Sequence, residues 1–399
     1  MPISSTVGHN YQLITEYIPT VNTAAIGIWL QNGARYEQPG QTGYAHFLEH
    51  LLFKGTPRHS GKALSTQFEV MGGHINAETG RELTAFHGVV PKQFGADLLA
   101  LLLDMITHTQ FSETDFLLER DVVLQELSML KDDPEEALED FSTEQVWGQH
   151  SMGKQILGTV DSLKTTTKET FTQYMKQTLC AHKLRIVAVG NVDQQALEDL
   201  CSEIDLVTSE TSTPAPPSYQ STHAELDIDA EQKHLLWLMP AVGYHDTQQA
   251  TYEIANHMLA GGYDSRLYQV LREQLGLVYS IHSRNDHYSD TGLWFIQTNT
   301  DNENNDKTVQ AVNKTIQQFI SEGPTQQELD FTRQHLQSAL ILESDDIESK
   351  MDTIAQDFIY CNRTVSLEEQ LQAYSEVTIS DIQDIIHTAW KQASFFSTV

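Results

Sequence analysis

Two histidines four residues apart, with a glutamate directly before the second, form the segment His46-Phe47-Leu48-Glu49-His50. Successive residues of an α-helix turn by about 100°, so His46, Glu49 and His50 would share one face. Two imidazoles one turn apart can bind a single metal ion, and a neighbouring carboxylate can act as a base toward a water on that ion. The spacing therefore predicts a metal site suited to hydrolysis, provided that its context agrees, because so short a motif also arises by chance.

The residues around the motif predict the helix that it needs. Apolar residues recur there at helical spacing, namely Ala45, Leu48, Leu51 and Leu52. Such a helix would bury one face in a core, and Gly55 is placed to end it. Because a catalytic zinc ion takes three protein ligands and keeps one position open, another ligand is expected on a rigid element elsewhere.

Two glutamates in a predicted helix over residues 112–127 are the best candidates for that ligand. Ser112 and Asp115 have the spacing of an N-terminal capping box. Glu119 and Glu126 are seven residues apart, so they project from nearly the same side of the helix. One can ligate the metal while the other orients a ligand histidine. In a chain with 55 acidic residues, two solvated glutamates are the alternative interpretation.

With these motifs the chain resembles the M16 (pitrilysin) family of zinc metallopeptidases, the inverzincins. The resemblance is strongest to subfamily B, which includes the β-subunit of mitochondrial processing peptidase and short bacterial peptidases. Seventy-five residues separate His50 from Glu126, as the family pattern requires. The resemblance assigns one Zn²⁺ per chain to His46, His50 and Glu126. It makes Glu49 the general base for the zinc-bound water, and it gives Glu119 a supporting role.

Other parts of the first half carry the same resemblance: residues 33–37, 42–45 and 72–79. Residues 72–79 match the family's G-G-x-x-N-A-x-T segment, which holds the substrate backbone as an added β-strand. The resemblance therefore implies that Asn76 and Ala77 bind substrate, and it adds Phe53 as a further substrate contact.

In the second half, residues 271–280 resemble the family's L-R-E-x-x-G-L-x-Y-S segment. The arginine and tyrosine of that segment, here Arg272 and Tyr279, approach the scissile peptide in the family. A guanidinium or phenol directed at the carbonyl oxygen would stabilise the oxyanion of the transition state. A helix end followed by a strand, with ordinary packing residues, is the alternative interpretation.

The two halves resemble distant copies of one another. Residues 112–126 align with residues 325–339, but Thr332 and Ala339 replace the two glutamates. The corresponding register for the metal helix replaces His46, Glu49 and His50 as well; the residues found there are Tyr252, Ala255 and Asn256. The second copy therefore keeps the scaffold without a metal site, and we expect it to serve binding or closure.

A segment rich in Ser, Thr and Pro over residues 208–222 predicts a linker between the halves. We expect a catalytic zinc-binding domain over residues 1–210 and a degenerate repeat without zinc over residues 223–399. The resemblance implies an α+β fold of the LuxS/MPP-like type, with two homologous domains. Each would have a mostly antiparallel sheet packed with helices, and together they would form half of a clamshell.

Composition places the chain among globular proteins. It has 399 residues, of which 40% are hydrophobic, and no run approaches the ~18 apolar residues of a membrane-spanning helix. The N-terminus lacks the features of a signal or transit peptide, so a bacterial cytoplasm is the expected location. The three cysteines, Cys180, Cys201 and Cys361, are scattered and odd in number, so no disulfide framework or cysteine metal site is expected.

The formal charge of −31 is spread over both halves of the chain. Such a charge argues against a nucleic-acid partner, whose phosphates would be repelled. It could favour cationic peptides by focusing the electrostatic field. Solubility, or adaptation to salt or cold, would explain the acidity equally well.

The sequence therefore predicts a zinc endopeptidase that hydrolyses peptides or unfolded polypeptides. The family encloses its substrate between four such domains, so two copies of this chain are expected to form a chamber. In a homodimer, Arg272 and Tyr279 would serve the zinc of the partner. A heterodimer with an inactive relative, a non-catalytic subunit, and a metal hydrolase acting on other bonds are the alternatives.

Overall fold

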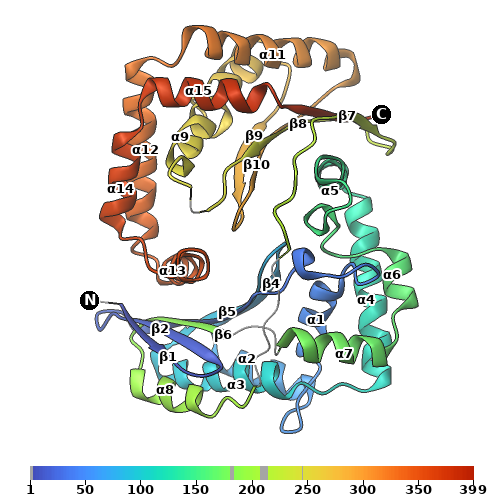
Figure 1. The fold of residues 1–399 in the computed structure, drawn as a ribbon, viewed down its shortest axis with the longest axis vertical. Coiled ribbons are helices and arrows are strands. Elements are labelled where there is room, and N and C mark those ends of the chain that lie inside the picture. The colour runs from blue at the N-terminus through green and yellow to red at the C-terminus, as the bar shows by residue number, and fades with distance from the viewer. Residues whose placement is uncertain (1–2, 180–183, 207–213, 245) are drawn as a thin grey trace. The chain divides into compact units, whose positions relative to one another are not determined.

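The computed structural model describes residues 3–179, 184–206, 214–244 and 246–399 (Figure 1). Contacts divide the chain into two compact units, each of which includes a segment from the other half of the sequence. Unit 1 comprises residues 1–129, 154–215 and 343–364, and unit 2 comprises residues 130–153, 216–342 and 365–399. The units are therefore not two uninterrupted halves. Cys180 and the first part of the predicted linker, residues 208–213, lie outside the described residues.

Unit 1 contains a six-stranded sheet in the order β1-β2-β6-β3-β5-β4. The strands are β1 (Ser4–Val7), β2 (Tyr11–Tyr17), β3 (Thr23–Leu30), β4 (His74–Thr79), β5 (Thr84–Pro91) and β6 (Leu184–Gly190). Neighbours run antiparallel except β2 and β6, which are parallel. β4 is an edge strand, because it pairs with β5 and with no other described strand.

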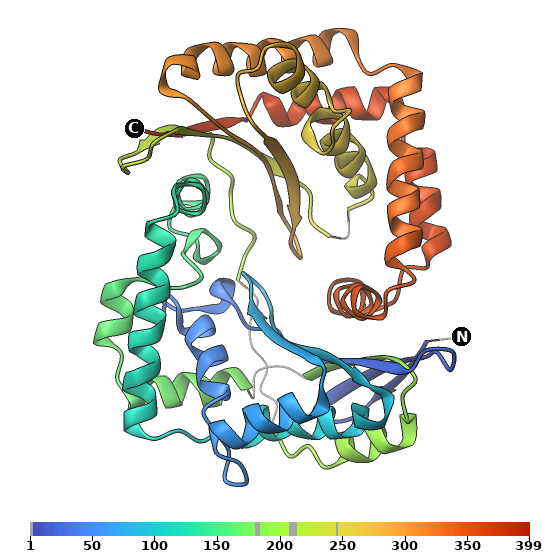
Figure 2. The ribbon, with the colours of Figure 1, turned by 180° about the vertical axis from the view of Figure 1, so that it is seen from behind.

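Helices cover both faces of this sheet, which explains why its central strands are buried almost throughout. Alternate residues of β3, such as Ile26 and Ile28, enter the main core of the unit. The intervening Ala25 and Trp29 pack against α13, whose Met351 is fully buried there. The helices of unit 1 are α1 (Tyr44–Leu52), α2 (Gly61–Met71), α3 (Gly95–His108), α4 (Glu113–Lys131), α6 (Val160–Thr165), α7 (Lys168–Leu179), α8 (Gln194–Ser202) and α13 (Ile347–Cys361). Figures 1 and 2 show α2, α3 and α8 on one side of the sheet and α13 on the other.

Unit 2 repeats this plan with five strands in the order β7-β11-β8-β10-β9. The strands are β7 (His223–Leu226), β8 (Lys233–Ala241), β9 (Ile281–His287), β10 (Gly292–Thr300) and β11 (Ser394–Thr398). Only β7 and β11 are parallel among these described pairs. The helices are α5 (Pro134–Trp147), α9 (Gln249–Ala260), α10 (Arg266–Tyr268), α11 (Asn305–Glu322), α12 (Gln326–Glu343), α14 (Leu367–Glu376) and α15 (Ile379–Trp390). α9, α11 and α15 contribute to one core of the sheet, and α5 packs on its opposite face.

The predicted duplication is visible in the topology. Strand order and direction in β7-β11-β8-β10-β9 equal those in β2-β6-β3-β5-β4. The long helices α4 and α12 begin with the same reciprocal capping, by Ser112 with Asp115 and by Thr325 with Glu328. The helix that follows each of them, α5 or α13, belongs to the other unit. The expected α+β fold of two homologous, mostly antiparallel domains is confirmed.

The predicted metal helix is α1, and it ends at Leu52, slightly before the predicted stop at Gly55. Phe53 caps its C-terminus in helical geometry, and Gly55 instead forms a bridge with Ser60. No helix of the described chain combines the length and apolarity that crossing a membrane requires.

A buried ion pair precedes α1. Arg35 is fully buried, and its Nη1 lies 2.6 Å from Oε1 of Glu82. Its Nη2 also donates to the carbonyl of Pro214 at 3.0 Å, and its backbone N–H donates to the carbonyl of Arg81. Removing one partner of such a pair is costly, because the remaining charge stays buried without compensation.

We predict that Glu82→Gln lowers the free energy of unfolding by about 3 kcal/mol or more. The control is Asp330→Asn, which breaks the more exposed pair between Asp330 and Arg333 and should cost about 1 kcal/mol or less. Thermal denaturation of both variants beside the parent protein measures the difference. Equal shifts in melting temperature would contradict a structural role for the buried pair.

Candidate active site

Helix α1 divides its residues between a core and a metal-binding face. Phe47, Leu48, Leu51 and Leu52 are fully buried in the core of unit 1. The opposite face carries His46 and His50, whose side chains are 13% and 15% exposed. Their ring centroids lie 4.6 Å apart. The apolar periodicity of the segment therefore places both imidazoles at the surface of the core, as predicted.

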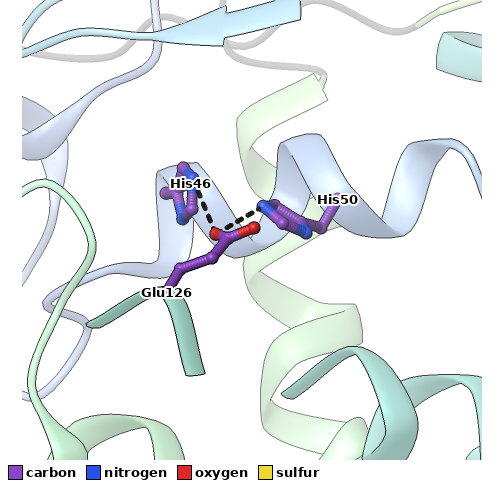
Figure 3. A group of neighbouring side chains, drawn as sticks. All are labelled: His46, His50 and Glu126. Atoms are coloured by element: carbon purple, nitrogen blue, oxygen red, sulfur yellow. Dashed lines mark ion pairs between the residues drawn. The ribbon is translucent and has the colours of Figure 1, made fainter. Parts of the chain in front are cut away.

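Glu126 reaches this pair from α4 (Figure 3). Its Oε2 lies 3.3 Å from Nε2 of His50 and 3.9 Å from Nε2 of His46. Ligand atoms of the three residues lie within 4.8 Å of one another, and no other such group of His, Cys, Asp or Glu occurs among the described residues. Two imidazole nitrogens and one carboxylate oxygen are a donor set that suits zinc. The residues present therefore fit a zinc ion.

The electrostatics of the two histidines differ. Burial, together with the charge of His50, lowers the pKa of His46 to about 4, so its imidazole is neutral and able to ligate. Burial would lower the pKa of His50 too, but its bond to Glu119 and the nearby charges of Glu126 and Glu49 outweigh burial and raise it.

Glu119 orients His50 from the side away from Glu126. Its Oε1 lies 2.9 Å from Nδ1 of His50, and its Oε2 is ion-paired with Lys54. Burial acts to raise the pKa of Glu119, but the bonds from His50 and Lys54 lower it overall. An ionised Glu119 holds the proton of His50 on Nδ1 and leaves Nε2 free toward Glu126.

Glu49 lies beside both histidines on α1 and is linked to the sheet. Its Oε2 accepts a hydrogen bond of 2.5 Å from the hydroxyl of Thr79, the last residue of β4. Burial raises the pKa of Glu49, although the bond from Thr79 and the charge of His50 oppose it. A carboxylate with a raised pKa is a stronger base, which suits proton abstraction from water.

The predicted substrate contacts lie in different settings. Asn76 is exposed and Ala77 half-buried on the edge strand β4, opposite His87 and Phe86 of β5. Phe53 packs at the margin of the core, with its ring centroid 6.1 Å from that of Phe86. β4 therefore offers backbone groups to an added strand, and the role of Phe53 stays a prediction.

Arg272 and Tyr279 lie on unit 2. The residues of the predicted zinc site lie on unit 1, namely His46, Glu49, His50, Glu119 and Glu126. Arg272 belongs to a π-helical turn, Gln269–Gln274. Its guanidinium carbon lies 4.9 Å from the ring centroid of Tyr279, which is 79% exposed. The two predicted side chains are therefore neighbours, and the phenol is accessible.

The second copy uses the equivalent positions for packing. Tyr252 and Ala255 are buried in the core of unit 2. Asn256 donates to the carbonyl of Ser283, and its side-chain oxygen accepts from the indole of Trp294. These contacts occupy the polar atoms that a ligand would need.

Three residues that support the site or its helix were not predicted from the sequence: Lys54, Thr79 and Glu37. Lys54 follows His50 by four residues, so helical spacing alone could have placed it near Glu119. Thr79 and Glu37 lie in segments that were recognised by resemblance. The bond of Thr79 to Glu49 spans 30 residues, and the bonds of Glu37 to the backbone of α1 span six and eight, so none of them follows from helix or strand periodicity.

Comparison with known proteins agrees with this geometry. Residues 12–160 match the family described as Insulinase (Peptidase family M16), and residues 165–336 match the Peptidase M16 inactive domain. The chain is 27% identical over 384 residues to the uncharacterized zinc protease YmxG of Bacillus subtilis, covering 95% of this chain and 93% of the relative. It is 28% identical over 373 residues to an uncharacterized zinc protease of Rickettsia bellii, covering 93% and 90%.

Solved structures share the fold along the whole chain. A protease from Helicobacter pylori superposes with a TM-score of 0.91 at 19% identity, covering 100% of this chain and 99% of that one. A peptidase M16 inactive domain from Pseudomonas fluorescens gives 0.89 at 16% identity, covering 100% and 98%. Together with the matches along both halves of the sequence, these findings place the chain in peptidase family M16, the family of zinc metallopeptidases that its motifs resemble.

Proposed function

We propose that this protein is a zinc endopeptidase that hydrolyses peptides or unfolded polypeptides. The observation that carries the proposal is the convergence of His46, His50 and Glu126 beside Glu49. Relatives named as zinc proteases that match almost the full chain support it. One zinc ion per chain, held by the two imidazoles and the Glu126 carboxylate, would complete the site.

A bound zinc ion supplies Lewis acidity, which polarises a peptide carbonyl and makes a water molecule acidic. Glu49 takes the proton of the attacking water and later delivers a proton to the leaving amine. The hydroxyl of Thr79 holds the Glu49 carboxylate in place through its 2.5 Å bond. Glu119 keeps the proton of His50 on Nδ1, so that Nε2 remains available as a ligand atom.

The edge strand β4 is the proposed binding surface for the substrate backbone. An extended peptide can add to an unpaired sheet edge through main-chain hydrogen bonds. Thr79, at the end of β4, contacts Glu49, so a peptide paired along Asn76 and Ala77 would run beside the catalytic carboxylate. Phe53 would contribute to a side-chain subsite.

A dimer is the proposed working form. Each chain carries the zinc residues on one unit and the Arg272–Tyr279 pair on the other, so a symmetric pair of chains could combine the two sets across its interface. The phenol or guanidinium would then stabilise the oxyanion on the partner's zinc site. A heterodimer with an inactive relative is the second arrangement. A purely non-catalytic subunit is disfavoured, because His46, Glu49, His50 and Glu126 are all present.

We predict that Glu49→Gln lowers kcat for a quenched fluorescent peptide roughly 10²–10⁴-fold, because the base is lost while the ligands remain. Zinc content, measured by metal analysis, should stay unchanged. Chelation should abolish the activity of the parent protein, and added zinc should restore it. A fully active Glu49→Gln protein would exclude the proposed base, and a parent protein that holds zinc but cleaves no peptide would favour a binding role.

We predict that Glu119→Gln weakens zinc binding about 10–100-fold, because His50 loses its ionised partner. Lys54→Met should weaken binding in the same direction but less, since it acts through Glu119. Competition with a chromophoric chelator measures both affinities. The control is Lys62→Met, an exposed lysine of α2, which should leave zinc binding unaltered. Unaltered affinity in Glu119→Gln would show that the carboxylate is not needed to orient His50.

The dimer proposal predicts complementation between two inactive variants. Glu49→Gln and Tyr279→Phe should each lose most activity alone. Co-expressed, they should recover about a quarter of the parent activity, since half of randomly assorted dimers would contain one complete site. Recovery is measured on the co-purified mixture with the same peptide. If the mixture stays as inactive as its components, Tyr279 does not act across an interface between identical chains.

A further inference from the structure

The N-terminus of the metal helix α1 has no local side-chain cap. Its N-cap residue is Gly43, in the left-handed conformation with φ of 90°. A Cβ atom placed on Gly43 would lie 2.5 Å from the Cα of Gly158 and 2.8 Å from the carbonyl oxygen of Leu157. Close packing and backbone conformation therefore both require glycine here. The Ser, Thr, Asp or Asn that usually caps a helix is excluded, and the first amides of α1 need another acceptor.

Glu37 supplies that acceptor from outside the helix. Its Oε2 accepts from the backbone N–H of Gly43 at 3.1 Å, and its Oε1 accepts from that of Ala45 at 2.9 Å. Glu37 is only 8% exposed, so water does not compete strongly for these bonds. Acceptor oxygens at this place complement the unpaired amides of the first helical turn. Both oxygens of Glu37 are thus committed to the first turn of α1.

Burial raises the pKa of Glu37 to about 8, while the bonds from Ala45, Gly43 and Tyr44 act to lower it. Burying such an acid is costly unless it is hydrogen-bonded, and both oxygens of Glu37 accept backbone hydrogen bonds. Glutamine cannot reproduce the two bonds, because its NH₂ group would face one of the amide donors.

The two metal-ligand histidines are held in different ways. His50 is oriented by its side chain, through the 2.9 Å contact of Nδ1 with Glu119. The Nδ1 atom of His46 is buried and has no hydrogen-bond partner among the described residues. The orientation of His46 therefore depends on packing and on its own backbone. Ala45, the residue directly before it, is the one whose amide Glu37 holds.

We propose that Glu37 is a positioning residue for the metal site, which fixes the first turn of α1 and thereby the placement of His46. The inference rests on the proposed zinc site. Glu119 orients His50 by contacting its side chain, whereas Glu37 orients His46 by holding the backbone amide of the preceding residue. A small displacement of His46 would impair the metal site, because the groups of such a site must be held within about 0.5 Å of their productive positions.

The test compares Glu37→Gln and Glu37→Ala with Asp193→Ala in the full-length protein. Asp193 caps α8 through a 3.2 Å bond from the amide of Ala196, so its substitution removes a helix cap away from the metal residues. We measure the zinc dissociation constant by chelator competition, the visible absorption spectrum of the Co²⁺-substituted protein, and the melting temperature. Glu37→Gln is the decisive variant if Glu37→Ala does not fold.

We expect Glu37→Gln to raise the zinc dissociation constant about tenfold, to change the Co²⁺ spectrum, and to lower kcat with little change in KM. Asp193→Ala should lower the melting temperature without altering either metal readout. A Glu37→Gln protein with parental zinc affinity and Co²⁺ spectrum would overturn the inference, even if it were less stable. A parent protein that binds no zinc would instead overturn the proposed function on which the inference rests.

Discussion

The structure depends on one constraint, which is that a single short helix must serve both a dry core and a metal site. The apolar residues of α1 are buried in the core. Its opposite face carries the side chains of His46, Glu49 and His50, which are only partly accessible to water. Ionisable groups in such a place are unfavourable unless each has a partner. The neighbouring elements supply these partners. α4 contributes Glu119 and Glu126, and β4 contributes Thr79, so the position of α1 against both elements decides whether a site exists.

The second copy shows what the scaffold does without that constraint. α9 corresponds to α1 in the expected register, and α12 begins with the same capping as α4. Where the first copy has histidine and glutamate, the second has Asn256, bonded to Ser283 and Trp294, and the buried Thr332. The polar atoms of Asn256, Ser283 and Trp294 are hydrogen-bonded to one another. The fold therefore does not need the metal residues for its stability, and their presence in the first copy is a property of the site.

Features with a local periodic signal could be predicted from the sequence, and features that rest on long-range contacts could not. The ligand face of α1 and the common side of Glu119 and Glu126 both follow from helix periodicity. The placement of α5 and α13 in the opposite units had no such signal. An amphipathic helix has the same pattern whichever sheet it covers. The bonds of Glu37 to α1 span only six and eight residues but also lack a periodic signal, because a glycine N-cap does not indicate which side chain accepts from the first amides.

Three carboxyl groups near α1 have differently shifted pKa values within a chain whose formal charge is −31. Neighbouring negative charges, such as those of Glu126 and Glu78, act to raise the pKa of Glu49, which favours a base. The same acidity would be harmful at Glu119, which must stay ionised to orient His50. There Lys54 supplies a compensating cation, and the pKa is lowered. At Glu37 the backbone amides of α1 oppose burial, but burial prevails and raises the pKa to about 8. Burial affects the pKa of each of these acidic groups, but each has different polar neighbours, and α1 brings these neighbours together.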